Sequence, residues 1–330
     1  MFVSDLQILR RQVRRSKKAA FAPGTWKNFR TQWYSFVAFT TFFDLDQFPS
    51  DPEVFCLYAQ LLSRSFKSNL SVKNYISGVK IFYSLLGLDC SVFDAMELKL
   101  TLRGISRIKQ HSPRHATPIN PDILLQIYEH LDMADAIQVA FWALFVVAFF
   151  SMARKSNLVV TEGKSVQNHT LLRNCVMFSE DSVLLRFTSS KTAQFGGKIH
   201  EVPLSAIPNS PLCPVVSLLR LFKMTSDVSL SEPVFSLAKG FPITYRHFQK
   251  VFKHMICLLG LNPSEFSSHS FRRGGATYAF SSSVPGELIK YHGGWASEAY
   301  WIYLQFSLED KLRVSKHMAH RASLVNMYTS

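Results

Sequence analysis

Residues 267–304 read SSHSFRRGGATYAFSSSVPGELIKYHGGWASEAYWIYL and bring together, in one short segment, the side chains that a phosphoryl-transfer site requires. His269 and Arg272 stand three residues apart at the start of a predicted helix, so their side chains share one face and can reach the same phosphate. Trp295 and Tyr303 follow on a second predicted helix. An imidazole, a guanidinium, an indole and a phenol in this order indicate chemistry on a phosphodiester.

The composition indicates a folded protein with a polyanionic partner. The chain has 330 residues, of which 47% are hydrophobic, and this is enough to bury the cores of two domains. Its formal net charge is +14 at pH 7. Because a strongly basic chain attracts polyanions, nucleic acid is the first candidate for the partner.

Cysteine usage and the apolar segments restrict the compartment. The five cysteines are scattered and form no C-x-x-C pair, which disfavours a zinc site and favours a reducing compartment. The N-terminus places a short apolar stretch before its charges, the reverse of a secretory signal. The most apolar run, residues 139–150, is shorter than the roughly 20 residues of a membrane span. We therefore expect no membrane association and no bound metal.

The first 110 residues are predicted to form a helical domain. No strand pattern occurs in them, and apolar side chains recur at helical spacing. The predicted helices start at Thr25, Asp51, Ser71 and near Glu97. Residues 10–18, RRQVRRSKK, are strongly basic. This segment is either a solvated helix or an arm that contacts phosphates or directs nuclear import.

A linker and a second, mixed domain are predicted after this bundle. Residues 111–121 contain three prolines and no apolar periodicity, which predicts a linker. In residues 122–330, a very apolar helix over 134–153 precedes Arg154, and the runs CVMF, SVLLRF and KIHEVPL predict a small antiparallel sheet. The fold class is therefore two-domain and mainly α: an N-terminal helical bundle followed by an α+β domain with a small antiparallel sheet.

The order His-x-x-Arg, Gly-Trp and Tyr, after an apolar helix that ends in Arg154-Lys-Ser-Asn-Leu, resembles the tyrosine recombinase or phage-integrase family. The resemblance covers residues 118–330 and is strongest to the type found in eukaryotic mobile elements, such as Cryptons and DIRS-type retrotransposons. It implies a SAM-like core-binding domain in residues 1–110 and a catalytic domain in residues 122–330. It also implies a DNA strand transferase that needs no metal, ATP or other cofactor and that self-associates as a dimer or tetramer on double-stranded DNA. The protein would be nuclear if its source is eukaryotic and cytoplasmic otherwise.

The resemblance assigns charge neutralisation and acid catalysis to three side chains. Two arginines, Arg154 and Arg272, would clamp the phosphate, since a guanidinium is permanently charged and binds phosphate oxygens bidentately. By composition alone, Arg154 also fits a cation that simply ends a helix. The resemblance places the acid for the leaving 5′ oxygen at Lys191, in a hairpin, with Lys198 as the alternative.

The resemblance assigns the remaining roles to the segment quoted first. His269 would take the proton of the attacking phenol or steady a non-bridging oxygen, Trp295 would donate to the phosphate, and Tyr303 would form the 3′-phosphotyrosine link. His292 is a weaker candidate for the role of Trp295, and Tyr300 competes with Tyr303. The neighbouring Arg273 is a candidate for contact with the DNA backbone.

Other functions fit parts of the same sequence. A domesticated recombinase-derived DNA-binding protein would keep the fold without strand exchange, and an enzyme like type IB topoisomerases would relax supercoils by similar chemistry. A metal-dependent transposase is disfavoured because its clustered carboxylates are missing. The segment LEDKLRVSKHMAHRASLV is predicted to be a terminal helix that packs on a neighbouring protomer or acts as an intramolecular lid.

Overall fold

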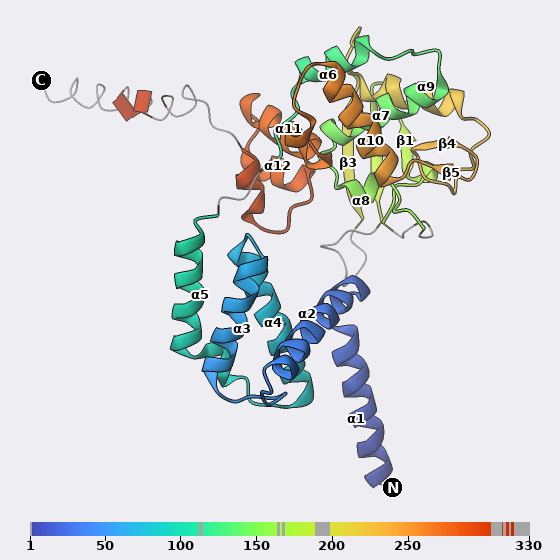
Figure 1. Cartoon of the computed structure of the whole chain (residues 1–330). Coiled ribbons are helices and arrows are strands. Elements are labelled where there is room, and N and C mark those ends of the chain that lie inside the picture. The colour runs from blue at the N-terminus through green and yellow to red at the C-terminus, as the bar shows by residue number, and fades with distance from the viewer. Residues whose placement is uncertain are drawn as a thin grey trace, which may run out of the picture. The chain divides into compact units, whose positions relative to one another are not determined.

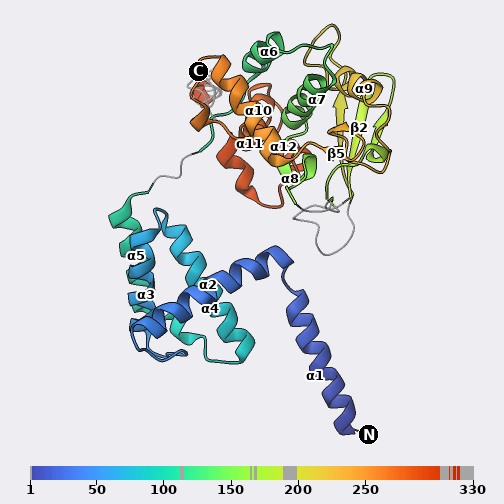
Figure 2. The same cartoon turned by 45° about the vertical axis from the view of Figure 1, so that its right-hand side comes forward.

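The computed structural model describes residues 2–111, 115–163, 166, 169–188, 199–304, 312, 315–316 and 318–319. The chain divides into two compact units, Met1–Arg114 and His115–Ser330 (Figures 1 and 2). None of the helices in the described ranges combines the length and hydrophobicity that crossing a membrane requires. Most of the predicted terminal helix lies outside the described residues.

The first unit is a helical bundle with an aromatic core, which confirms the predicted fold class for this half. Phe36 and Phe55 stack with ring centroids 5.3 Å apart, and both side chains are fully buried. Figures 1 and 2 show the first helix projecting away from the others. The elements are α1 (Phe2–Ala19), α2 (Pro23–Phe42), α3 (Pro52–Ser65), α4 (Asn69–Leu86), η1 (Ser91–Asp94) and α5 (Met96–Lys109).

Two of the predicted helix starts in this unit are wrong by about one turn or less. Asp51 caps α3 as predicted, because its carboxylate accepts from the amide of Glu53 at 2.9 Å. Helix α2 begins at Pro23, before the predicted Thr25, because proline is favoured at the first helical position. Helix α4 is capped by Ser68 rather than Ser71.

The second unit packs helices around a small antiparallel sheet, which confirms the predicted α+β architecture. Its helices are α6 (Pro121–Glu129), α7 (Ala136–Phe150), α8 (Lys155–Leu158), η2 (Arg173–Cys175), α9 (Pro214–Met224), α10 (Tyr245–Leu258), η3 (Pro263–Glu265), α11 (Ser268–Ser281), α12 (Gly286–His292) and η4 (Glu298–Tyr303). Its strands are β1 (Val176–Phe178), β2 (Ser182–Phe187), β3 (His200–Ser205), β4 (Ser236–Ala238) and β5 (Phe241–Pro242).

The sheet runs in the order β1-β2-β3, with both neighbouring pairs antiparallel. Val183, Leu185 and Phe187 of the central strand are buried at alternate positions, so one face of the sheet covers the core. Helix α9 packs against this sheet and against α7. A further two-stranded ladder, β4-β5, was not predicted, because strands of three and two residues have no visible alternation.

Helix α7 is the buried centre of the second unit, and the prediction of its end is wrong. It ends at Phe150 rather than at residue 153, because Met152 adopts a left-handed conformation with φ 50°. Ser151 stabilises the turn, since its hydroxyl donates to the carbonyl of Val147 at 2.6 Å. Arg154 therefore lies one turn beyond the helix, at the residue that precedes α8.

Helix α11 approaches its neighbours backbone to backbone. A Cβ on Gly274 would lie 1.9 Å from the carbonyl oxygen of Ile119, and a Cβ on Gly275 would lie 2.1 Å from that of Phe149. Both positions therefore require glycine. This close approach brings the start of α11 next to the end of α7.

Part of the segment predicted to be a linker is attached to the start of α11. The amide of Thr117 donates to the carbonyl of Glu265 at 2.8 Å, and the amide of Ile119 donates to that of Ser270 at 3.0 Å. Arg273 donates from Nη1 to the carbonyl of Ala116 at 3.1 Å. Arg273, a candidate for DNA contact by sequence, therefore holds the entering chain.

A buried arginine also caps the C-terminal end of α9. Arg173 is 3% exposed, and its guanidinium donates to the carbonyls of Thr225 at 2.6 Å and of Phe222 and Val228 at 3.4 Å. It also lies 4.2 Å from the centre of the Phe222 ring. The cation satisfies carbonyls at and beyond the helix end, where the helix dipole favours positive charge.

Candidate active site

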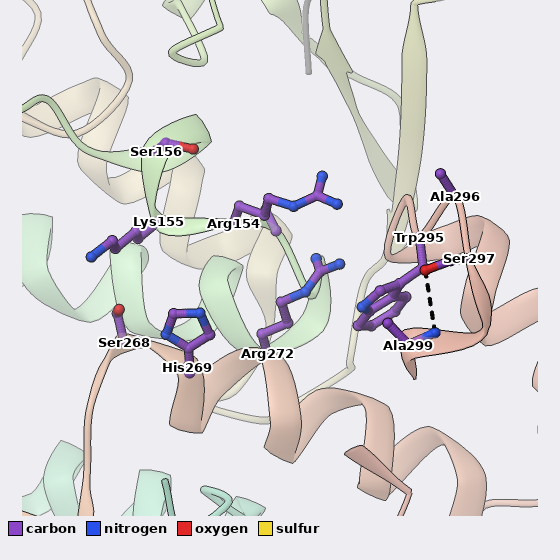
Figure 3. Close-up of a pocket in the computed structure, with 11 residues that line it drawn as sticks. Arg154, Lys155, Ser156, Ser268, His269, Arg272, Trp295, Ala296, Ser297 and Ala299 are labelled. Carbon is purple, nitrogen blue, oxygen red and sulfur yellow. Dashed lines mark hydrogen bonds between the residues drawn. The ribbon is translucent and has the colours of Figure 1, made fainter. Parts of the chain in front are cut away.

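A pocket of about 330 Å³ in the second unit gathers residues from three separate segments (Figure 3). These segments are the turn before α8 with its first residues, the start of α11, and the stretch that leads into η4. No acidic side chain is among the described residues that line it. The lining consists of Ala153, Arg154, Lys155, Ser156, Ser268, His269, Arg272, Trp295, Ala296, Ser297 and Ala299.

Arg272 is fixed on one side by the protein and lines the pocket on the other. It is 4% exposed, and its Nη1 donates to the carbonyls of Met152 and, at 2.8 Å, Gly293. Its guanidinium lies 3.7 Å from the centre of the Trp295 ring, a cation–π contact that holds the plane of the group. Met152, whose left-handed conformation follows the end of α7, thus accepts a hydrogen bond from this arginine through its carbonyl.

Arg154 enters the same pocket from the start of α8 (Figure 3). It is half-buried, and its Nη2 donates to the carbonyl of Gly294 at 3.3 Å. Because Gly293 and Gly294 are consecutive, two neighbouring carbonyls orient the two arginines. A Cβ on Gly293 would lie 1.8 Å from the Trp295 ring, and Gly294 has φ 64°. Glycine is therefore required at both positions.

Two histidine side chains form hydrogen bonds that hold the backbone next to this pair of glycines. Nε2 of His292 lies 2.9 Å from the carbonyl oxygen of Phe150, and Nε2 of His200 lies 3.1 Å from that of His292. Since a carbonyl only accepts, both rings carry their proton on Nε2. Burial lowers the pKa of each. The Nε2–H of His292, the weaker alternative to Trp295, is thus already used in a hydrogen bond to the last residue of α7.

His269 occupies the first turn of α11, beside Arg272 (Figure 3). Partial removal from water lowers its pKa, and the positive charges of Lys155 and Arg272 lower it further. The ring is therefore neutral at pH 7 and able to accept a proton.

Lys155 is a pocket residue that sequence reasoning missed. Its Nζ lies 3.5 Å from the centre of the Tyr245 ring, and its side chain lines the pocket beside His269. The only signal in the sequence is its place directly after Arg154. A charged residue at the start of a short helix is otherwise indistinguishable from a solvated one.

Comparison with solved structures identifies the fold. The XerH site-specific recombinase bound to a palindromic difH substrate gives a TM-score of 0.57 at 16% identity, over 82% of this chain and 72% of that one. The Tn1549 transposon integrase with a circular intermediate DNA gives 0.59 at 13% identity, over 94% and 98%. This is the tyrosine recombinase fold.

A lambda integrase dimer bound to a COC′ core site supports the same conclusion, with a TM-score of 0.56 at 13% identity over 88% of this chain and 93% of that one. Neither the models of known protein families nor the curated protein sequences match this chain. At such low identity the tyrosine recombinase likeness establishes the fold, and the role of each residue has to rest on its own geometry.

Four of the six residues that the sequence singled out line one pocket of this tyrosine recombinase fold: Arg154, His269, Arg272 and Trp295. Tyr303 is the last residue of η4, and its side chain lies outside the described part of the structure. Lys191 and its alternative Lys198 lie wholly outside it.

Tyr300, the competitor of Tyr303, is a core residue. It is 2% exposed, and its ring centroid lies 6.2 Å from that of Trp295. Burial raises the pKa of its phenol, and the charges of Glu298 and Glu287 raise it further. These are the opposite conditions from those that activate a nucleophile.

Proposed function

We propose that this chain is a site-specific DNA recombinase or integrase that cuts and rejoins DNA through a 3′-phosphotyrosine intermediate. The observation that carries the proposal is the pairing of Arg154 and Arg272. They come from distant parts of the sequence, line one pocket, and donate to the consecutive carbonyls of Gly293 and Gly294. Two cations in a pocket without an acidic lining residue are suited to one phosphate group.

The two arginines would neutralise the charge that develops on the non-bridging oxygens during cleavage. Arg272 suits this role because its carbonyl partners and the Trp295 ring already hold its guanidinium. A donor fixed before the reaction needs no reorganisation in the transition state. In this scheme Trp295 both positions Arg272 and offers its indole N–H to the phosphate.

Tyr303 is the proposed nucleophile. The phenol oxygen attacks phosphorus, the bond to the 5′ oxygen breaks, and the phosphate stays linked to the enzyme at the 3′ end. Neutral His269 accepts the phenol proton, and Lys191, or alternatively Lys198, donates one to the leaving 5′ oxygen. The burial of Tyr300 supports this choice, since a buried phenol of raised pKa attacks poorly.

The wider proposal concerns energy, partners and origin. The ester keeps the energy of the broken bond, and cationic side chains supply the charge, so we propose that the reaction needs neither ATP nor a metal ion. Among the described residues, no three His, Cys, Asp or Glu side chains gather to hold a metal.

We further propose that the first domain is a SAM-like, core-binding domain and that the protein assembles as a dimer or tetramer on DNA. We also propose that it is a nuclear protein of a Crypton- or DIRS-like mobile element.

Covalent capture on genomic DNA tests the proposal. The purified chain is incubated with fragmented genomic DNA and EDTA, denatured, and the DNA that remains attached is sequenced. We expect wild type and Tyr300→Phe to retain a shared set of sites and Tyr303→Phe to retain none. Attachment that persists in Tyr303→Phe, or that requires Mg²⁺, would contradict the mechanism, and attachment without site preference would favour a topoisomerase.

A further inference from the structure

Ser268 carries a buried hydroxyl without a hydrogen-bond partner in the described part of the chain. It is the first residue of α11, is 8% exposed, and lines the pocket. Buried hydroxyl groups nearly always have a partner. Because this one faces a pocket, it marks a position for a ligand atom.

Lys155 lies in the same part of the pocket, and the contact that holds its ammonium group does not neutralise the charge. Its ammonium contacts the face of Tyr245, and it forms no ion pair with any described carboxylate. An aromatic face attracts a cation but leaves its charge uncompensated. Lys155 is therefore available to a second anion.

The start of α11 favours an anion but offers few backbone donors. The amide of His269 donates to Oγ of Ser267 at 3.2 Å, and that of Ser270 donates to the carbonyl of Ser267 at 2.8 Å. The positive end of the helix dipole remains. Contacts to a ligand at this end therefore fall to the side chains of Ser268 and Lys155.

Figure 3 separates the pocket into two ends. Arg154 and Arg272 lie near Trp295, whereas Lys155 and Ser268 lie on the side of His269 away from Trp295. A pocket of about 330 Å³ lies within the size range of sites for whole small molecules. It therefore has room for more than one phosphate group.

We propose that Lys155 and Ser268 bind a second phosphate, the neighbour on the same DNA strand of the phosphate held by Arg154 and Arg272. This inference rests on the proposed function, because it takes the arginine pair as the site of the phosphate to be cleaved. Two adjacent phosphates fix both the position and the direction of a strand. The second contact would therefore hold the first phosphate in register with the nucleophile.

Thymidine 3′,5′-bisphosphate is the probe, because it carries two phosphates spaced as along a DNA strand. Phosphorus NMR resolves its two groups, so each can be followed as the wild-type chain is added. We expect both signals to shift, and the bisphosphate to bind about tenfold more tightly than either thymidine monophosphate. A shift of one signal alone, or equal affinity for the three nucleotides, would overturn the second site.

Variants separate the two ends. Lys155→Gln and Ser268→Ala should each stop the shift of one phosphorus signal and lower affinity for the bisphosphate to that of a monophosphate. Arg154→Ala should affect the other signal. Lys253→Gln, at an exposed position of α10 outside the pocket, is the matched control and should change nothing. Equal loss of both signals in Lys155→Gln would mean a single anion site.

The assay involves no cleavage, so its result does not depend on that of covalent capture. A chain that forms DNA adducts but holds one phosphate of the bisphosphate would keep the proposed function and lose the second site. A chain that holds both phosphates and forms no adduct would keep the two-phosphate pocket but lose the proposed reaction.

Discussion

The second unit contains two buried arginines whose surroundings are alike in chemistry and different in access. Arg173 and Arg272 are 3% and 4% exposed, both donate to backbone carbonyls, and each lies against an aromatic ring. Arg173 closes the end of α9 inside the core. Arg272 has a similar set of contacts on one side and lines a pocket on the other.

The comparison teaches that burial and carbonyl partners do not distinguish an arginine inside the core from one that lines a pocket. Both arrangements stabilise a buried cation. What differs is the set of neighbouring side chains, since Arg272 shares its pocket with Arg154, Lys155 and His269. The described lining of that pocket has several cationic side chains and no carboxylate, and Arg173 is not part of it.

Replacement of the pocket arginine should have the largest effect. Arg272→Lys keeps a positive charge but loses the planar donor set, and we expect covalent attachment of DNA to fall about 10³-fold. DNA binding, which depends on many phosphate contacts, should change little. Gel shift and adduct formation on the same DNA measure the two, and a parallel loss of both would make Arg272 structural, like Arg173.

Replacement of the core arginine should affect stability instead. Arg173→Met removes the guanidinium that donates to three carbonyls, and we expect it to lower the free energy of unfolding of the second unit by about 3 kcal/mol. Urea unfolding measures this, and the remaining folded protein should form adducts normally. The control Arg186→Met removes an exposed ion pair with Glu201 and should cost less than about 1 kcal/mol.

The pH dependence of adduct formation should report the pocket and not the core. Because the pKa of His269 is lowered, its neutral form persists as pH falls to the ordinary value of 6.5, and the rate should decline only at lower pH. Lys155→Gln removes one cause of the shift, so the decline should move to higher pH. Arg173→Met should leave the profile unchanged, and a decline that stays in place in Lys155→Gln would contradict the coupling.

Removal of the Tyr300 hydroxyl should have the smallest effect. Tyr300→Phe retains the ring that packs near Trp295, so we expect full adduct formation and a change in unfolding free energy of less than about 1 kcal/mol. Thermal unfolding and adduct assays measure these. Loss of the adduct without unfolding would make the buried phenol part of the chemistry.

Much of the fold could be predicted because periodicity and caps are local signals. Asp51 is predicted to start a helix and does so, accepting from the amide of Glu53 in the first turn. The alternating pattern of residues 182–187 likewise predicted the central strand. The end of α7 could not be predicted, because it depends on the left-handed conformation of Met152, whose carbonyl accepts from a guanidinium distant in sequence.

The site could be predicted in part for the same reason. His269 and Arg272 share a helix face, so their spacing carries information. The carbonyls of Gly293 and Gly294 accept hydrogen bonds from two arginines that are distant in sequence, and this relation exists only in three dimensions. Arg173 and Lys155 were missed because a single basic residue has the same appearance in a core, in a pocket or in solvent.

The attachment of residues 116–119 to the start of α11 has a mechanical consequence. Thr117 is hydrogen-bonded to Glu265, just before this helix, and Ile119 to Ser270, in its first turn. Ala116 accepts a hydrogen bond from Arg273 of the same helix. A pull on the connection is therefore borne first by the helix that carries His269 and Arg272. A displacement of residues 116–119 would therefore move the helix whose side chains line the pocket.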